Sequence, residues 1–377
     1  MKTFSIDKDT VYCAALTCAL LSLVTKTTFL GIPSIIRQSF LVFSLILLFF
    51  NYIYYNTYIS IDLKYIFIAA IYLIISFVSF RKSHEIQLLL TPLFILGAKD
   101  ISLKKILKTF IITNSIILGI TVLLFLGGII PESTAMRNGI IRHSFGFSWP
   151  TDLASMLFYL LCADLYLCLK NNRSLISRWI VYLILGYVTF SLSDARLGST
   201  MIFLLLPLSY ALKKIDIKKK HVLFYKLMPL SLVICMILSI GIVNYYTNNP
   251  LSNISVFLND LSSNRLYLTD LAVQRFGYTL WGQYNDTGVL RSLLHLQGFY
   301  VDSSYYMFFT NYGIILFIIV AIAFYCFNKR LVKNQNYILS IFLALAAIMG
   351  IFESHFYFFQ YDIFILALFS KINDKNM

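Results

Sequence analysis

Long, uninterrupted apolar segments recur throughout this chain and limit how it can fold. The first of them, residues 11–30, reads VYCAALTCALLSLVTKTTFL. That is long enough to cross the hydrocarbon core of a bilayer, which takes about 20 apolar residues. Because 59% of the 377 residues are hydrophobic and only 13% are charged, a water-soluble globule has no means of burying them all. The runs are continuous and do not alternate as the strands of a membrane β-barrel do. The sequence therefore predicts an all-α, polytopic membrane protein.

About twelve membrane spans are predicted, within a single integral membrane domain that covers residues 1–377. The expected spans are 11–30, 35–55, 63–80, 86–98, 106–130, 151–169, 179–193, 197–212, 227–246, 303–327, 336–352 and 355–370. The fourth is short enough to be a half-helix or a re-entrant element. The longest stretch without a span, residues 247–302, is predicted to be a large external loop within the domain.

The first span is expected to be a retained anchor, because only Lys2 and Lys8 precede it and no small-x-small cleavage site follows it. All six cysteines lie in apolar runs and none forms a CxxC pair, so neither a metal cluster nor a disulfide framework is predicted. The lipid bilayer is the expected surrounding, and no nucleic-acid partner is predicted.

The basic residues predict the orientation, since cytoplasmic loops of membrane proteins are enriched in Lys and Arg. The clusters at 99–108, 170–178, 213–226 and 329–333 are assigned to the cytoplasm, which also places both termini there. Arg81 and Lys82 fall on the opposite side and do not fit the rule.

Lysine and arginine divide unequally between the two predicted faces. The cytoplasmic face receives 18 Lys and 3 Arg, and the external face receives 2 Lys and 8 Arg. The external arginines are Arg37, Arg81, Arg137, Arg142, Arg196, Arg265, Arg275 and Arg291. Because the guanidinium fork suits bidentate contact with phosphate or carboxylate, this division indicates an anionic ligand on the external face. The alternative is contact with lipid head groups or wall polymers.

The first external cluster is the segment 131–152, which joins the fifth and sixth predicted spans. Gly146 permits an unusual backbone angle or a close backbone approach. Pro150 suits the start of a helix, and Asp152 would then lie in its first turn, where the helix dipole favours a carboxylate. Nothing structural requires a cation at Arg142, which favours a role in binding.

Two further external clusters carry ionisable groups. Asp194 and Arg196 lie in the short turn 191–199, where they form either an ion pair or a charged cleft. In the loop 247–302, the residues after Arg265 predict an amphipathic helix on which Arg265 and Arg275 lie within about 80° of each other. Aromatic residues of this loop suit sugar rings or the membrane interface.

Several short motifs resemble a known family. They are RHSFGF at 142–147, NRL at 264–266, RFG at 275–277, WGQ at 281–283 and VDSSYYMFFTNYG at 301–313. With the overall topology, these motifs resemble the Wzy-type polysaccharide polymerases of capsule and exopolysaccharide clusters, which belong with the O-antigen polymerases and ligases.

The resemblance implies a GT-C-like glycosyltransferase in the bacterial cytoplasmic membrane. Its implied activity is the polymerisation of undecaprenyl-pyrophosphate-linked oligosaccharide repeat units at the outer face, with a chain-length regulator protein as a possible partner. External arginines are implied to hold the pyrophosphate, which carries over to Arg142, Arg196, Arg265 and Arg275. Related ligases often have His-Asn where this chain has Val301-Asp302, which favours a polymerase.

A general base is expected to take the proton from the attacking sugar hydroxyl. The candidates are Asp194, Asp302, His143 and Glu353, with Asp194 slightly favoured because it lies beside Arg196. No DxD-like metal site and no His/Asp cluster with ligand spacing occurs in the external loops, so the reaction is predicted to be metal-independent, with no cofactor.

Two alternatives belong to other classes. Twelve spans around a basic cavity also suit a flippase or transporter of the same lipid-linked oligosaccharide. Transporters often contain related halves, and no such repeat is visible here. An O-antigen or wall-polymer ligase would differ only in its acceptor.

Overall fold

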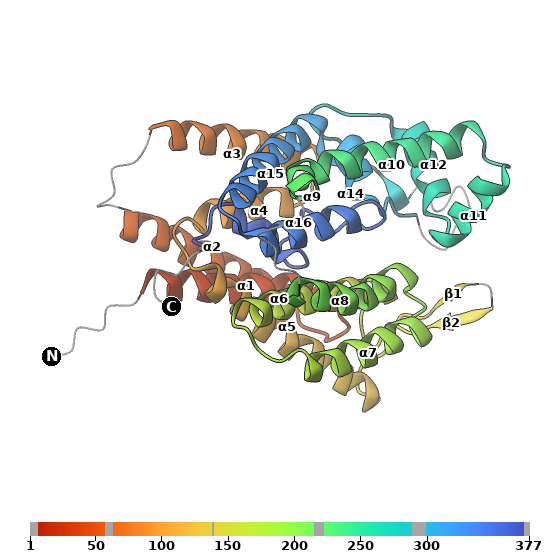
Figure 1. The fold of residues 1–377 in the computed structure, drawn as a ribbon, viewed down its shortest axis with the longest axis horizontal. Helices are drawn as coiled ribbons and strands as arrows, with labels where there is room; N and C mark the ends of the chain where they lie inside the picture. The colour runs from red at the N-terminus through yellow and green to blue at the C-terminus, as the bar shows by residue number, and fades with distance from the viewer. Residues whose placement is uncertain (1–6, 57–62, 138, 215–221, 289–298, 373–377) are drawn as a thin grey trace. The chain divides into compact units, whose positions relative to one another are not determined.

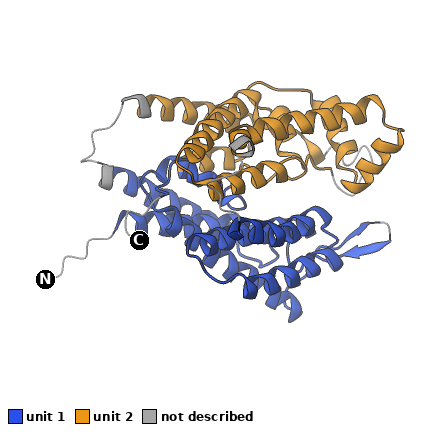
Figure 2. Cartoon of the chain, viewed as in Figure 1, with its two compact units in different colours: residues 1–60, 94–216, 359–377 blue, residues 61–93, 217–358 orange. Residues whose placement is uncertain are grey.

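A computed structural model describes residues 7–56, 63–137, 139–214, 222–288 and 299–372 (Figure 1). The chain divides into two compact units, drawn in two colours in Figure 2. Unit 1 comprises residues 1–60, 94–216 and 359–377, and unit 2 comprises residues 61–93 and 217–358. Each is therefore assembled from segments far apart in the sequence. The single membrane domain stays a prediction.

Unit 1 is a helical bundle whose helices pack in two connected groups. Helix α1 packs against α2 and α5, and α6 packs against α5, α7 and α8. Large buried side chains such as Tyr12, Phe110 and Phe158 form its core. The bounds are α1 Lys8–Thr25, α2 Ser34–Asn56, α5 Leu103–Leu126, α6 Pro150–Lys170, α7 Ile176–Ser191 and α8 Arg196–Lys214.

Unit 2 is built around α10, which contacts α12, α15 and α16. Tyr305, Phe308 and Tyr357 are fully buried among these helices. The bounds are α3 Leu63–Ser83, α9 Val222–Leu227, η1 Met228–Leu230, α10 Ser231–Asn248, α11 Asn253–Leu261, α12 Arg265–Phe276, α14 Ser304–Met307, η2 Phe308–Tyr312, α15 Ile314–Lys333 and α16 Tyr337–Met349. The residues of helix α4 (Gln87–Gly97) up to Leu93 belong to unit 2, and those from Phe94 belong to unit 1.

Seven helical segments in the described part of the chain are long and apolar enough to cross a membrane. They are Lys8–Thr25, Ser34–Ile53, Ile66–Ser83, Leu103–Leu126, Pro150–Lys170, Tyr225–Asn248 and Ile314–Lys333. Two of them bury only 17% of their residues, and large apolar side chains such as Phe49 and Phe67 are exposed. A helix with so much exposed apolar surface requires an apolar solvent. The chain is a mostly helical, multi-pass membrane protein.

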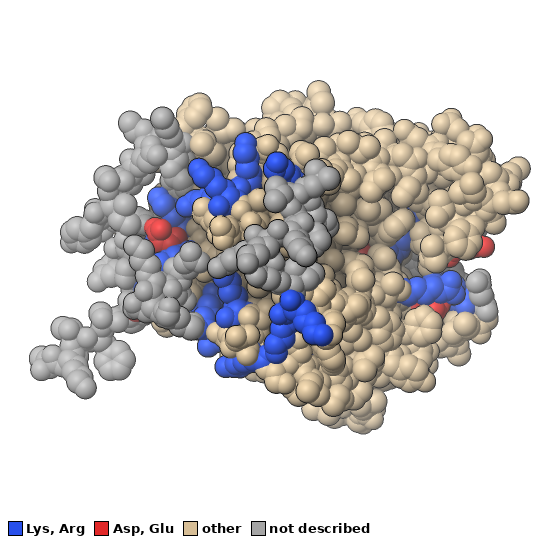
Figure 3. All heavy atoms as spheres, in the orientation of Figure 1, with Lys and Arg blue, Asp and Glu red and all other residues tan. Residues whose placement is uncertain are grey.

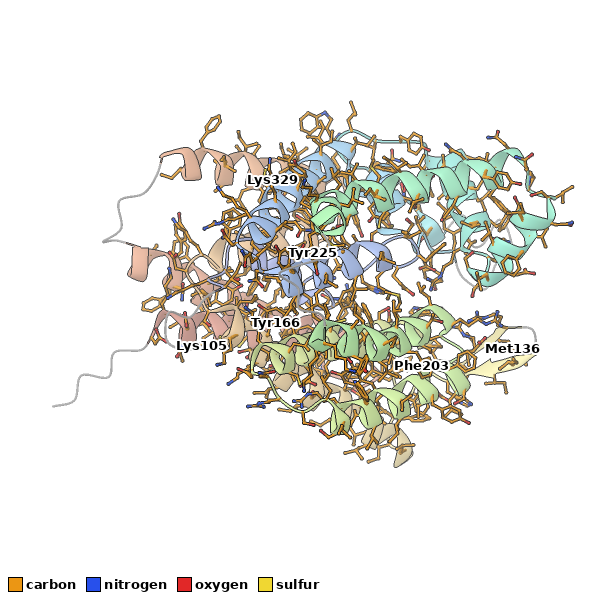
Figure 4. All side chains as sticks on the ribbon, viewed as in Figure 1. Lys105, Met136, Tyr166, Phe203, Tyr225 and Lys329 are labelled. Carbon is orange, nitrogen blue, oxygen red and sulfur yellow. The ribbon has the colours of Figure 1, made fainter. Side chains whose placement is uncertain are left out.

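Charged side chains are distributed unevenly within unit 1. On the face drawn in Figure 3, Lys and Arg gather over the ends of its helices, and other residues cover the surface between them. Lys105, in the first turns of α5, and Met136 lie at opposite ends of the unit (Figure 4). Such a belt without charges is what a bilayer-embedded helical bundle requires.

Several predicted spans are shorter than a bilayer core. The described helices α4, α7 and α16 have 11, 16 and 13 residues. At a rise of 1.5 Å per residue they extend about 16–24 Å, less than the roughly 30 Å of hydrocarbon. The short fourth span is thus confirmed as a short helix.

The predicted helical span over residues 355–370 is wrong. This segment forms turns and the 3₁₀-helix η3 (Ile363–Leu368), at whose start the Asp362 side chain accepts from the Phe364 N–H at 3.1 Å as an N-cap. Most of its residues are buried by protein. Irregular backbone is tolerated at membrane depth only under such cover, so apolar composition alone did not identify a helix.

The tenth predicted span, 303–327, also differs. The helical path breaks at Gly313, and α15 begins at Ile314. Gly313 has φ of 107°, and a Cβ atom there would lie 2.8 Å from the backbone N of Gly282 and the backbone O of Leu280. The chain from 279 to 283 therefore approaches this position too closely for any residue with a side chain.

The predicted external loops contain secondary structure of their own. A two-stranded antiparallel hairpin, β1 (Ala135–Arg137) and β2 (Ile140–Arg142), departs from the all-α expectation. Helices α11 and α12 lie in the loop 247–302, and α12 confirms the predicted helix after Arg265. Residues 289–298 of that loop, with Arg291, and residues 215–221 of the predicted cytoplasmic cluster lie outside the described residues.

Candidate functional site

The β1–β2 hairpin of unit 1 presents two of the predicted external arginines on one face, of which only Arg142 was predicted to bind the ligand. Ala135 pairs with Arg142 and Arg137 pairs with Ile140. Since side chains alternate between the faces of a strand, Arg137 and Arg142 lie on the same face. Met136 lies on the opposite face, is 67% exposed, and marks the hairpin in Figure 4.

The turn between α7 and α8 receives these arginines. Arg137 Nη2 donates to the backbone carbonyl of Asp194 at 2.6 Å, and Arg137 Nε lies 3.2 Å from Asp194 Oδ2. Arg196 Nε lies 3.1 Å from Asp194 Oδ1. Arg142 Nε donates to the backbone carbonyl of Ser193 at 3.1 Å. Asp194 itself adopts a left-handed backbone conformation, with φ of 42°.

This group, which we call the arginine cluster, consists of Arg137, Arg142, Asp194 and Arg196. Three guanidinium groups surround a turn that carries one carboxylate. Asp194 is buried, with 11% of its side chain exposed, whereas 37% of Arg196 is exposed. The cluster therefore has an excess of positive charge, part of it accessible, which is the arrangement expected of an anion site.

A second pair lies in the same loop. His143 Nδ1 lies 2.6 Å from Glu132 Oε1. Because a carboxylate only accepts hydrogen bonds, Nδ1 carries the proton, and Nε2 of a neutral His143 is then the proton acceptor. Glu132 Oε2 also accepts from the backbone N–H groups of Ser144 and Phe145, at 3.1 and 3.2 Å. The carboxylate is held by the loop, and the imidazole is held by the carboxylate.

The loop between the hairpin and α6 is tightly packed at Gly146. Its φ is 84°, and an added Cβ atom would lie 2.9 Å from Ile130 Cδ1 and 3.0 Å from Thr121 Cγ2. Its carbonyl accepts from the Phe29 N–H at 2.9 Å. The predicted close backbone approach is thus confirmed. Pro150 begins α6 and Asp152 lies in its first turn, as predicted.

A different cluster lies in unit 2, where Arg265 begins α12. Arg265 Nε lies 2.9 Å from Asp302 Oδ2, and Arg265 Nη1 lies 2.9 Å from Glu353 Oε1. The guanidinium also donates to the backbone carbonyl of Phe352. His355 Nδ1 lies 3.6 Å from Glu353 Oε2. Here one guanidinium faces two carboxylates, so the balance of charge is the reverse of that in unit 1.

Burial and neighbouring charges act in opposite directions on the ionisation of this second cluster. Burial alone would raise the pKa of Glu353, but Arg265 and His355 outweigh it and lower that pKa below its usual value. Burial alone would lower the pKa of Arg265, and Asp302 and Glu353 outweigh it and raise that pKa. The group is a mutually stabilised buried ion network.

The two arginines predicted to share a face of α12 have different surroundings. Arg265, at the start of the helix, has only 12% of its side chain exposed and is engaged with carboxylates. Arg275, in the last turn, is exposed, and among the described residues no ion pair to it is recorded. The amphipathic pattern located the helix but did not separate a buried cation from an exposed one.

Sequence reasoning found most members of both clusters and missed two residues, Arg137 of the arginine cluster and Glu132, the partner of His143. It placed Arg137 among the external cations without assigning it to the site, although Arg137 makes the shortest contact to Asp194. It did not single out Glu132, which is eleven residues before His143. The signal for Glu132 was its position directly after Pro131 in a loop otherwise rich in cations.

No family model, no curated protein and no solved structure matches the chain. Among the described residues, no group of three or more His, Cys, Asp or Glu side chains is arranged to hold a metal ion. The class of the protein therefore rests on its fold, a multi-pass helical membrane protein, and metal independence stays a prediction.

Proposed function

We propose that the protein is a Wzy-type polysaccharide polymerase. In this proposal it has about twelve membrane crossings, a GT-C-like architecture and cytoplasmic termini, and it joins undecaprenyl-pyrophosphate-linked oligosaccharide repeat units at the outer face of the bacterial cytoplasmic membrane. A chain-length regulator is its expected protein partner. The observation that carries the proposal is the arginine cluster, because three guanidinium groups around one carboxylate provide the charge that a pyrophosphate needs.

The arginine cluster has the properties of a leaving-group site. A pyrophosphate leaves a sugar with negative charge that fixed cations stabilise. Arg142 and Arg137 reach the turn from the hairpin, and Arg196 reaches it from the first turn of α8. Asp194 acts as a positioning residue, since both of its carboxylate oxygens face guanidinium groups.

His143 is the proton acceptor in the proposed reaction. The acceptor hydroxyl oxygen bonds to the anomeric carbon, the bond from that carbon to the pyrophosphate oxygen breaks, and its electron pair leaves with the phosphate. The hydroxyl proton passes to His143 Nε2, since Nδ1–H is engaged by Glu132. This choice among the four predicted bases follows from the Glu132 contact, which fixes the tautomer.

The distribution of cations supports the proposed orientation. Within unit 1, the hairpin end carries Arg137, Arg142 and Arg196, whereas Lys105 lies at the opposite end (Figure 4). Lysine-rich ends favour the cytoplasm. The arginine end is then the end available to a lipid-linked sugar outside.

The test is extension of a defined lipid-linked repeat unit by the purified protein, with Arg142→Lys and His143→Gln variants. Lysine keeps the charge of Arg142 but loses the fork, so we expect polymer formation to fall at least about tenfold. His143→Gln should fall by about 10²-fold or more. Arg330→Lys, in the last turn of α15, is the matched control and should retain full activity.

Normal polymer length in both variants would refute the assignment of the cluster. Addition of a chelator should leave the activity unchanged, and its loss would overturn metal independence. In a deletion strain, single repeats should accumulate at the outer face, whereas repeats trapped inside would indicate a flippase. Polymer of normal length that is not attached to its acceptor would indicate a ligase.

A further inference from the structure

A groove of about 500 Å³ lies in unit 1 between α5, α6 and α7. Its volume is within the range of binding sites for small organic ligands. Most of its lining is apolar, with Leu118, Leu157 and Leu185 among the side chains that the three helices contribute. The proposed glycosyl transfer makes no use of this groove.

One end of the groove is polar. Arg178 Nε donates to Asp164 Oδ2 at 2.8 Å and Arg178 Nη2 to Asp164 Oδ1 at 3.4 Å, which is a bidentate pair. Tyr182 Oη donates to the same carboxylate at 3.1 Å, and Arg178 Nη1 donates to the Ser174 carbonyl at 3.2 Å. Asp164 is the only acidic side chain in the described lining, and this contact neutralises it.

Three exposed cations lie beside this polar end. Lys108 precedes Ile111 by three residues on α5, so it continues the stripe of Ile111, Ser115 and Leu118 that lines the groove. Lys213 Nζ donates to the Arg173 carbonyl at 3.4 Å. Arg173, Arg178 and Lys213 all lie near Cys168, one turn beyond Asp164 on α6, where they outnumber the single carboxylate of Asp164. The mouth of the groove is therefore positively charged.

The groove is also accessible from the apolar surroundings of the unit. Val181, which lines it, is 48% exposed, and Ile180 and Ile184 beside it on α7 are 57% and 56% exposed. A surface of this kind on a multi-pass protein faces hydrocarbon. An apolar channel open to hydrocarbon, with cations at one end, complements an acyl chain joined to an anionic head group.

We propose that this groove binds a glycerophospholipid with an anionic head group. One acyl chain lies along Leu118, Leu157 and Leu185, and the phosphate lies at Lys108, Arg173 and Lys213. The Asp164–Arg178 pair lies between the position of the acyl chain and the position of the phosphate. The site would fix α7 against α5 and α6 independently of any catalytic role.

The test compares two lipids with identical acyl chains, phosphatidylglycerol and phosphatidylcholine, added to the full-length protein in detergent. Phosphatidylglycerol should raise Tm by on the order of 5 °C, because a ligand of the folded state alone stabilises it. Native mass spectrometry should show one retained phosphatidylglycerol per chain. The triple variant K108Q/R173Q/K213Q should lose both the shift and the retained lipid.

Two further variants separate the parts of the site. Val181→Trp fills the groove from an exposed position and should abolish the shift without removing a charge. The variant K329Q/R330Q/K333Q removes as many positive charges as the triple groove variant, but from the end of α15. It should keep the rise in Tm with phosphatidylglycerol. The proposal would be overturned if both lipids raised Tm equally, or if the triple groove variant kept the full rise in Tm. It would also be overturned if glycerol phosphate alone produced the full rise in Tm.

Discussion

Three carboxylates, one paired with His143 and one in each of the two clusters, differ in what holds them. Glu132 accepts from an imidazole and two backbone amides, Asp194 faces two guanidinium groups, and Glu353 faces one guanidinium and His355. Asp194 and Glu353 thus hold cations in place, whereas Glu132 orients a proton acceptor. Substitution of each should produce a distinct result.

Glu132→Gln should impair both the fold of its loop and the proposed chemistry. Glutamine keeps one carbonyl oxygen and replaces the other oxygen with an NH₂ group, which leaves at least one donor without an acceptor, at a cost of about 1–3 kcal/mol. The variant should melt at a lower temperature, and its polymer output should fall by at least about tenfold.

A double-mutant cycle separates the two effects. If Glu132 acts through His143, the polymerisation defect of Glu132→Gln with His143→Gln should be no greater than that of His143→Gln alone. Defects that simply multiply would show that Glu132 serves the fold only, and Glu132 would then lose its assignment as the positioning residue.

Glu353 predicts how stability depends on pH. Because its pKa is lowered in the folded protein, its contribution is fully present above its ordinary value of 4.5 and is lost as pH falls through the lowered pKa. Thermal melting in detergent should show Glu353→Gln less stable than wild type at neutral pH, with the difference narrowing below about pH 4.5. Asp260→Asn, at an exposed position on α11, is the control for loss of a carboxylate and should melt close to wild type at neutral pH. A stability difference between Glu353→Gln and wild type that stays constant with pH would contradict the lowered pKa of Glu353.

At the scale of elements, the break before α15 depends on one glycine. Gly313→Ala should destabilise unit 2 by on the order of 1–3 kcal/mol, because φ of 107° strains any residue with a side chain. Its Cβ would also press on the backbone at Leu280 and Gly282. Gly241→Ala in α10 has nothing within 4 Å of the added Cβ and should be neutral or stabilising. Equal melting temperatures for both variants would show that the break is not under strain.

Several helices could be predicted from apolar runs of span length. That rule located Leu103–Leu126 and Pro150–Lys170 within a few residues. It was wrong for 355–370, which forms buried turns and the 3₁₀-helix η3 although its composition is apolar. Hydropathy measures only the preference of side chains for an apolar medium, and buried turns share that preference with helices.

At the scale of the whole molecule, the residue types of the candidate sites could be predicted, but their partners could not. The unequal distribution of lysine and arginine between the two predicted faces indicated which arginines were candidates for the site. Arg137 and Asp194 are 57 residues apart, and Arg265 and Glu353 are 88 apart, so only the folded chain brings them together. The Asp194–Arg196 pair, two residues apart, was the one contact that local spacing could indicate.

The proposed orientation predicts which positions are accessible from outside an intact cell. The probes are Met136→Cys, on the hairpin, and Lys329→Cys, on α15 (Figure 4). Each is made in a Cys326→Ser background because Cys326 is the exposed native cysteine among the described residues. A membrane-impermeant maleimide should label Met136→Cys in intact cells and Lys329→Cys only after permeabilisation. The physical reason is that lysine-rich segments stay in the cytoplasm during insertion. Labelling in the reverse order would place the arginine cluster inside the cell. A pyrophosphate-linked substrate at the outer face could not reach it there, so both the proposed orientation and the polymerase proposal would fail.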